Sequence, residues 1–568
     1  MPNFDARTRD TWLFWITALL VLGAGLGLRD PWPADEPRFA LVAKQMVESG
    51  NWLFPHRGIE LYSDKPPMLM WLQAAFYTVS GNWRVAFLLP SLLAALGTLW
   101  CVQDLGRRLW TRKVGLYAAW ALLFAFQFTW QSKKAQIDPL VTFFITLANY
   151  GLLRHVLLGP DWRWWTLGWF AAGLGTITKG VGAIALLMLL PAAIASLRGW
   201  PRVRVHARDA RFWLGPLAFV VAVSLWLLPV VAVALARDLP EYRAYLDDIL
   251  FRQTAKRYSQ SWDHHQPPWY FLSVMLAMWI PPVLALPWAI PAWWRRLRRR
   301  DARYLLPLAW WAMALVFFSI QDGKRDVYIM PALPMMCLAL APLLPGLLRK
   351  RWAQALLLVL AGLLALLFLA AGLALFGGDG AMAGRLQQQR GLTAAGLHAG
   401  AWMLLAMGVW GVACVLAFRR RAVVALFSTL GGVWVVFSLV GYPILNDASS
   451  SRGVMNAVGK RIGPDAGLGL VAWKEQNLLM ADRAAANFGF KLAWDEQLRR
   501  GVAWQAQAPG RWLLVQEEAL ADCLDPERIE LAGISNRRRW WLVPPGSVMG
   551  TCEASAGQRA EQGREEAE

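Results

Sequence analysis

Residues 352–377 read WAQALLLVLAGLLALLFLAAGLALFG, a stretch without a charged side chain. A helix needs about 20 consecutive apolar residues to cross the hydrocarbon core of a bilayer. By this criterion the sequence predicts a polytopic α-helical membrane protein with about 13 transmembrane helices. The predicted spans are 11–29, 84–103, 113–131, 137–154, 164–178, 181–197, 212–236, 268–292, 303–320, 326–346, 352–377, 397–418 and 422–442.

The composition supports a membrane location. Hydrophobic residues make up 57% of the 568 residues and charged residues only 17%, whereas soluble domains are about 25% charged. A net charge of +20 raises the question of nucleic-acid binding. The Lys and Arg residues lie in short clusters between apolar runs and not on one basic face, so we exclude a nucleic-acid partner. Their partner is instead the lipid bilayer.

The basic residues of the short loops predict the orientation of the chain. One set of alternate loops carries 25 Lys and Arg residues, and the opposite set carries seven. Because basic loops stay in the cytoplasm, the N-terminus is predicted to be cytoplasmic. With thirteen spans the C-terminal tail is predicted to lie on the opposite, extracytoplasmic side.

The predicted spans divide the chain into three parts. Residues 1–442 form a membrane domain that includes a first extracytoplasmic loop, 30–83, and a second, 237–267. Residues 443–552 alternate short apolar runs with turns, which predicts a small α/β domain, and residues 553–568 form a disordered tail. Cys523 and Cys552 lie in this outer part, where they either form a disulfide or remain two free thiols.

The first loop carries the most informative chemistry. Asp35 and Glu36 follow the first span directly, and residues 39–48 alternate apolar and polar positions at helical spacing, as in a helix lying along the membrane surface. Asp64 and Lys65 precede two prolines, which stiffen the turn. The lysine is suited to neutralising a phosphate leaving group. A plain ion pair at a turn is the alternative reading.

These motifs carry a resemblance. Asp35-Glu36-Pro37-Arg38-Phe39, Ser49-Gly50-Asn51-Trp52 and Asp64-Lys65-Pro66-Pro67 resemble the first loop of the aminoarabinose transferases of lipid A. Those enzymes belong with the protein O-mannosyltransferases to the polyprenyl-phosphate-sugar-dependent glycosyltransferases with the GT-C fold. Trp473-Lys474-Glu475-Gln476 and Asp482-Arg483 in the tail extend the similarity. The chain departs from the family pattern at Asp64, where Glu is common, and at Phe39, where Tyr is common.

The resemblance implies roles for individual residues. It implies that Asp35 and Asp138 are the carboxylates of a catalytic site and that Lys65 stabilises the departing phosphate. Candidate substrate-binding residues are Glu36, Arg38, Asp64, Lys179, Arg252, Lys324, Arg325 and Tyr328. The cost of burying charge in a membrane independently favours a functional role for Asp138 and Lys179. Snorkelling loop charges and an interfacial aromatic are the alternative for the individual residues.

A divalent metal is a further candidate. Asp64 and one of the adjacent histidines His264 and His265 are suitable ligands, although the sequence does not supply a complete ligand set.

The function predicted from these features is inverting transfer of a sugar from a polyprenyl-phosphate carrier to an envelope acceptor. Aminoarabinose and lipid A are the sugar and acceptor that the resemblance implies. A protein hydroxyl acceptor, as in the protein O-mannosyltransferases, is the alternative within this class. A transporter or flippase of lipid-linked sugars is the alternative from another class, but it predicts charges in mid-span and paired half-repeats.

Overall fold

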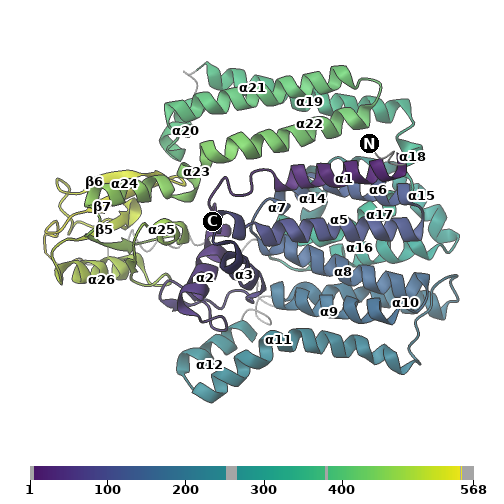
Figure 1. Cartoon of the computed structure of the whole chain (residues 1–568), viewed down its shortest axis with the longest axis horizontal. Helices are drawn as coiled ribbons and strands as arrows, with labels where there is room; N and C mark the ends of the chain where they lie inside the picture. The colour runs from purple at the N-terminus through teal and green to yellow at the C-terminus, as the bar shows by residue number, and fades with distance from the viewer. Residues whose placement is uncertain (1–5, 251–264, 378–380, 551, 553–568) are drawn as a thin grey trace.

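The computed structural model describes residues 6–250, 265–377, 381–550 and 552 (Figure 1). All thirteen predicted spans are helical. The helices of the first seven spans are α1 (Ala6–Gly23), α5 (Leu89–Leu109), α6 (Arg112–Leu123) with α7 (Phe126–Ser132), α8 (Ile137–Leu158), α9 (Trp162–Lys179), η1 (Val181–Met188) with α10 (Leu189–Leu197), and η2 (Ala210–Trp213) with α11 (Leu214–Arg237). Those of the remaining six are α14 (Tyr270–Met278) with η4 (Pro282–Ala285) and α15 (Leu286–Arg298), α16 (Ala302–Ile320), η5 (Asp326–Ala332) with α17 (Leu333–Leu340) and α18 (Leu344–Leu347), α19 (Arg351–Phe376), α21 (Ala394–Ala417), and α22 (Ala422–Val436) with η6 (Phe437–Gly441).

Not every span is one long helix. Within the described residues, seven helices are long and apolar enough to cross a membrane by themselves. Helices α14 and α15 form a pair that is bent by 104°, which makes an eighth span if the pair is counted as one. Pro281 and Pro282 interrupt the helical hydrogen bonding at the bend. The other predicted spans are helical but shorter, interrupted or less apolar, as expected where neighbouring protein satisfies the backbone.

The spans form one bundle with a helix layer at each edge. In Figure 1, α11 lies along one edge, α19, α21 and α22 form the other, and α5, α8 and α9 lie between them. Small residues allow close helix packing. A Cβ added at Gly151 in α8 would overlap the backbone of Trp164 and Gly168 in α9. The two helices therefore cross at backbone contact.

The first loop folds on the outer end of the bundle. Pro37 starts α2 (Glu36–Ser49), and Gly50 ends it in a left-handed conformation. A hairpin of β1 (His56–Arg57) and β2 (Glu60–Leu61) follows, then α3 (Met68–Ser80) and α4 (Trp83–Ala86). Helix α2 is amphipathic as predicted, and its apolar residues other than Val47 are buried. In Figure 1, α2 and α3 lie between the bundle and the C-terminal domain.

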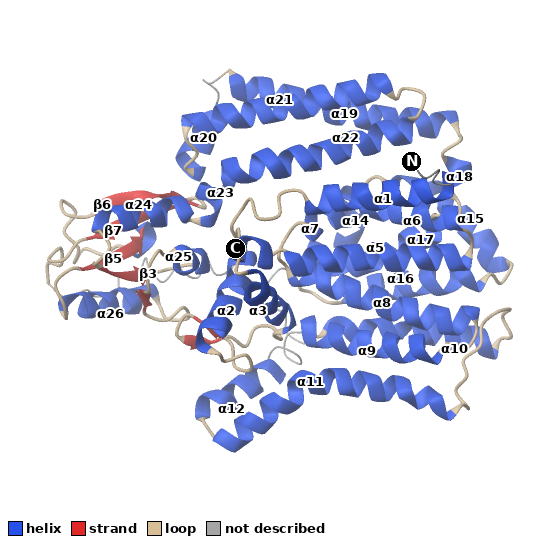
Figure 2. Cartoon of the chain, viewed as in Figure 1, coloured by secondary structure: helices blue, strands red, loops and turns tan. Residues whose placement is uncertain are grey.

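The C-terminal domain is a small α/β unit (Figure 2). Its sheet has the order β4-β3-β5-β7-β6. Strand β3 pairs in parallel with β4 and β5, and β7 pairs antiparallel with β5 and β6. The strands are β3 (Gly467–Val471), β4 (Ala485–Asn487), β5 (Arg511–Gln516), β6 (Glu530–Ser535) and β7 (Arg538–Val543). The helices of the domain are α23 (Tyr442–Ser450), α24 (Arg452–Ile462), α25 (Glu475–Met480), α26 (Trp494–Ala506) and η7 (Glu517–Ala519). Two further helices, α12 (Pro240–Asp247) and α20 (Ala381–Arg390), lie outside this domain. A disulfide joins Cys523 to Cys552, which decides between the two alternatives left open by the sequence.

A buried carboxylate joins these parts. Asp30 accepts hydrogen bonds from Arg84 at 3.0 Å, from Arg452 at 2.5 Å and from the Asn446 amide at 2.8 Å. Burial opposes the charge of Asp30, but these hydrogen bonds outweigh it and lower the pKa of Asp30 from 3.8 to about 2. The end of the first span, the start of α4 and the C-terminal domain thus meet at one charged group.

Candidate active site

Asp35 occupies the N-terminal end of α2 without capping it. Its carboxylate accepts no hydrogen bond from the first turn of the helix. It accepts one from the Gln136 amide at 3.3 Å and one from the Arg325 guanidinium at 3.5 Å. Arg38, one turn along α2, lies 3.9 Å from its other oxygen. The carboxylate is therefore held by two hydrogen-bond donors and a neighbouring guanidinium from three parts of the chain, and 17% of its side chain stays exposed.

Asp138 forms a second group with Lys179 and Tyr328. Asp138 lies in the first turn of α8 and pairs with Lys179, the last residue of α9. An acid at a helix N-terminus and a base at a helix C-terminus both suit the helix dipoles. The Lys179 ammonium lies 4.7 Å from the centre of the Tyr328 ring, within cation–π distance.

Arg325 pairs with Asp35 and is influenced by the charge of Asp138. It immediately precedes η5 and pairs with Asp35. Burial opposes its charge, but Asp35 and then Asp138 outweigh this effect, and the pKa of Arg325 is raised above its usual value. Gln136, which donates to Asp35, is two residues from Asp138. Asp35, Asp138, Lys179, Arg325 and Tyr328 therefore belong to one site.

A second ion network brings the C-terminal domain to this site. Glu475, the buried first residue of α25, accepts a hydrogen bond from Arg38 at 3.0 Å and lies 3.6 Å from Arg57. Arg57 also lies 3.7 Å from Asp64. Burial opposes the charge of Arg38, but Glu475, Tyr62 and Asp35 outweigh it and raise the pKa of Arg38. Arg38 therefore remains charged beside Asp35.

The hairpin of the first loop fits closely against the same domain. Gly58 has a φ of +68°, and a Cβ there would overlap Trp473 and Asn487. Arg57 stacks over Phe490 with 3.8 Å between its guanidinium carbon and the ring centre. This contact holds the segment leading to Asp64 against the C-terminal domain.

The buried carboxylate of Glu36 is fully engaged with neighbouring groups of the protein. Its carboxylate forms two hydrogen bonds with the Arg29 guanidinium, at 2.5 and 2.7 Å, and accepts the backbone N–H groups of Trp32 and Ala135 at 2.8 Å. Both side chains are almost fully buried. These contacts link the start of α2 to the loop before α8, and so fix Asp35 relative to Asp138. The geometry suits a positioning residue better than one that contacts substrate.

The remaining candidates are spread around this centre. Lys65 is half-buried at the turn before α3. Lys324 is buried, and its ammonium donates to the backbone carbonyl of Gln266 at 2.8 Å, next to Arg325. His265 is exposed and its backbone pairs with Gly323. Arg252 and His264 lie outside the described residues.

The structure adds little to the predicted metal site. Across residues 6–250, 265–377 and 381–550, no three His, Cys, Asp or Glu side chains form a group that could hold a metal ion. Of the three candidate ligands, Asp64 lies beside the Arg57 cation and His264 is not described. The metal site stays a prediction.

Three residues of the site were not predicted from the sequence: Arg57, Gln136 and Glu475. Glu475 lies in the Trp473-Lys474-Glu475-Gln476 motif that carried the resemblance, and this motif was the available signal. Arg57 and Gln136 lie in segments without a distinguishing pattern, and only the fold brings them to the carboxylates.

The chain is similar to known proteins in sequence and in fold. Residues 64–228 match the family described as dolichyl-phosphate-mannose-protein mannosyltransferase. The crystal structures of ArnT from Cupriavidus metallidurans superpose on the chain with TM-scores of 0.72 for the apo state and 0.71 for the state bound to undecaprenyl phosphate. Their sequences are 19% and 18% identical to this one, and the superpositions cover 95% of this chain and 98% and 99% of ArnT. The chain has the ArnT fold.

Relatives in sequence point to the same group. The chain is 31% identical over 350 residues to an undecaprenyl phosphate-alpha-4-amino-4-deoxy-L-arabinose arabinosyl transferase of Pectobacterium carotovorum. The alignment covers 58% of this chain and 59% of the relative. It is 29% identical to the transferase of the same name from Pseudomonas savastanoi, over 59% of this chain and 61% of the relative. The alignments thus span about 60% of these relatives. The resemblance to ArnT and the predicted fold class are confirmed.

Proposed function

We propose that the chain is a membrane glycosyltransferase that transfers aminoarabinose from undecaprenyl phosphate to lipid A. The observation that carries the proposal is the meeting of Asp35 and Asp138 with Arg325 and Lys179 at one end of an ArnT-fold bundle. The relatives named above as arabinosyl transferases support the sugar and its carrier.

The reaction is a single displacement at the anomeric carbon of the sugar. An acceptor oxygen forms a bond to this carbon while the bond from the carbon to the carrier phosphate oxygen breaks, and the electron pair leaves with undecaprenyl phosphate. The configuration inverts because the acceptor attacks opposite the leaving group. If the acceptor is a phosphate of lipid A, it is already an anion, so positioning and charge neutralisation matter more than proton removal.

We assign some residues of the site to the acceptor and the sugar, and others to the phosphate of the donor. Asp35, held by Arg325, Arg38 and Gln136, orients the acceptor or the sugar amine, and Asp138 supports it through the shared Arg325. Lys65, Lys179 and Arg325 are the cations that neutralise the departing phosphate. Tyr328 orients Lys179. Asp64 and Arg57 line the approach from the first loop.

The orientation of the chain in the membrane is part of this proposal. The site lies at the end of the bundle that also carries the first loop and the C-terminal domain (Figure 1). The clustered basic residues between the helices favour a cytoplasmic location for the opposite end. The proposed site therefore faces the periplasm of a bacterial inner membrane.

Protein O-mannosylation is the second candidate, because the matching family model carries that description. A protein hydroxyl must lose its proton on transfer, so Asp35 would then act as a general base. Purified chain offered both lipid A and a Ser/Thr-rich peptide should glycosylate only lipid A under the first proposal and only the peptide under the second. A flippase would yield no glycosylated product with either acceptor.

The decisive variant is Asp35→Asn, assayed in detergent with radiolabelled undecaprenyl-phosphate aminoarabinose and lipid A. We expect transfer to fall at least about 100-fold, as when one preorganised electrostatic group is removed from an active site. Glu48→Gln is the matched control, because Glu48 lies on the same helix but is exposed and should not affect transfer. Unchanged transfer by Asp35→Asn, with the protein folded, would contradict the proposed role.

A further inference from the structure

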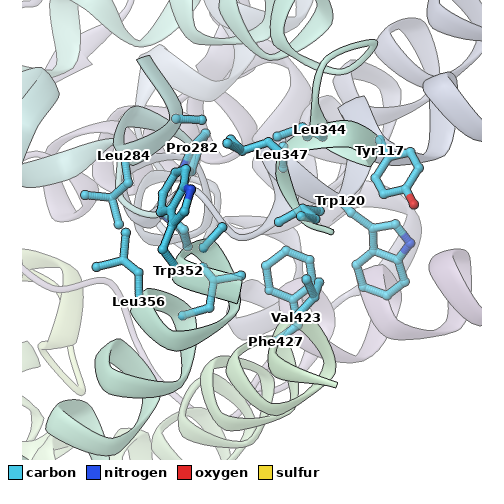
Figure 3. Close-up of a pocket in the computed structure, with 16 residues that line it drawn as sticks. Tyr117, Trp120, Pro282, Leu284, Leu344, Leu347, Trp352, Leu356, Val423 and Phe427 are labelled. Carbon is cyan, nitrogen blue, oxygen red and sulfur yellow. The ribbon is translucent and has the colours of Figure 1, made fainter. Parts of the chain in front are cut away.

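An apolar pocket lies on the bundle (Figure 3), near α15 and α18 at the end away from the first loop and the C-terminal domain (Figure 1). Its walls come from α6, the segment around η4, α18, α19 and α22, and Trp120, Leu284, Leu347, Trp352, Leu356 and Phe427 are among its lining residues. The cavity between these residues has a volume of about 90 Å³ and is open on one side. The lining is almost entirely apolar. Leu356 is both a lining residue and exposed, so the pocket opens on the surface that faces lipid.

Two basic clusters flank the pocket in the chain. Arg349, Lys350 and Arg351 lie between the lining residues Leu348 and Trp352, and Arg419, Arg420 and Arg421 end two residues before the lining residue Val423. Gln354 holds the two clusters together. Its amide donates to the carbonyl of Leu348 at 2.5 Å and accepts the N–H of Ala422 at 3.1 Å.

These six cations are not neutralised by the described part of the protein. All six residues are exposed, and none forms an ion pair with a described carboxylate. Residues 344–356 and 416–427 contain no Asp or Glu. Trp288 and Trp352 stack beside them, with ring centres 4.0 Å apart, and both are partly exposed. Exposed tryptophans beside Lys and Arg are typical of the headgroup level of a bilayer.

We propose that this pocket binds an anionic phospholipid of the leaflet opposite the active site. One acyl chain fills the apolar pocket, and the headgroup phosphate lies against the basic residues at its mouth. Basic sites between transmembrane helices suit anionic headgroups. Because the walls come from α6 and η4 on one side and from α19 and α22 on the other, the bound lipid joins the outer helix layer to the bundle.

Native mass spectrometry of the delipidated full chain tests the proposal without any variant. Phosphatidylglycerol and phosphatidylethanolamine with the same acyl chains are titrated separately. The first bound phosphatidylglycerol should bind at least tenfold more tightly. Equal affinity for the two lipids would overturn the proposal. Displacement of the first bound phosphatidylglycerol by undecaprenyl phosphate would also overturn it, because the occupant of the pocket would then be the carrier lipid.

Two pairs of variants locate the binding. The triple variant Lys350→Gln, Arg351→Gln, Arg420→Gln should abolish the preference for phosphatidylglycerol, whereas the control Arg198→Gln, Arg204→Gln, Arg208→Gln removes three exposed basic residues of another loop and should keep it. Leu356→Trp should fill the pocket and weaken the binding of both lipids. Leu363→Trp, on the same helix but outside the pocket, should not. An equal loss in variant and control would contradict the proposed site.

Discussion

At the scale of single residues, the candidate site is defined by paired charges at helix ends. Asp138 and Lys179 pair where α8 begins and α9 ends, and Asp35 begins α2 but turns its carboxylate away from the helix. A buried ion pair contributes little net stability, because desolvation offsets the attraction. Retaining one in a bundle therefore suggests a functional role.

The pairing of Asp138 with Lys179 predicts coupled effects on activity. Asp138→Asn and Lys179→Gln should each lower kcat/KM about 100-fold, and the double variant should be little worse than the poorer single variant. The reason is that either change alone leaves the partner without its counter-charge, so the two losses share one cause. A double-mutant cycle on kcat/KM measures the coupling, with melting temperature as the check on folding. Losses that multiply would show that the two residues act independently.

Glu475 has a different role at this scale, because it holds Arg38 and Arg57 and lies on another domain. Glu475→Gln should lower kcat/KM about tenfold or more, since a hydrogen bond to a charged group contributes roughly 1.5–3 kcal/mol. To separate a positioning role from a role in folding, kcat and KM are measured individually and compared with the melting temperature of the variant. Glu527→Gln, exposed in the same domain, is the control. Wild-type kinetics in Glu475→Gln would exclude a role for the C-terminal domain in the site.

At the scale of elements, close helix crossings place the charged ends. Asp138 at the start of α8 and Lys179 at the end of α9 lie on the same side, and the separation of the two helices depends on Gly151 and Gly168. Helix α2 packs directly against α25 of the C-terminal domain. The backbone packing in mid-bundle therefore controls the geometry at the outer end.

The crossing of α8 and α9 predicts a stability effect. Gly151→Ala adds a methyl group where the backbone of α9 already lies, and such overpacking costs about 1–3 kcal/mol. Gly362→Ala in α19 is the control, because nothing lies within 4 Å of the added group. There the alanine should be neutral or should stabilise the helix by up to about 1 kcal/mol. Melting temperatures in detergent compare the two, and equal values would contradict the close crossing.

At the scale of the whole molecule, the bundle, the first loop and the C-terminal domain are joined by buried polar contacts. Asp30 meets Arg84 and Arg452, and Glu475 meets Arg38 and Arg57. The outer parts are therefore held over the site by charge as well as by apolar packing. Conditions that remove the charge should loosen this arrangement.

The junction at Asp30 predicts a pH dependence of stability. Its pKa is about 2 in the folded chain and 3.8 ordinarily, so its charged contacts stabilise the fold fully above about pH 4 and lose this effect as the pH falls toward 2. Asp30→Asn should lower the melting temperature at pH 7, and the difference from wild type should shrink between pH 4 and pH 2. A difference that is constant over this range would show that Asp30 contributes no charge-dependent stability.

The sequence by itself determined the helical membrane fold, because apolar runs of the length of a bilayer have few other stable states, and it located Asp35, Asp138 and the first loop through motif and the cost of buried charge. It did not determine which cations meet which carboxylates. Arg325 is 290 residues from Asp35, and Glu475 is 437 residues from Arg38. Such pairings depend on how helices cross and where domains dock, which local patterns do not encode. Only the tertiary structure brought Arg57, Gln136 and Glu475 to the site, paired Cys523 with Cys552, and formed the apolar pocket between two basic loops.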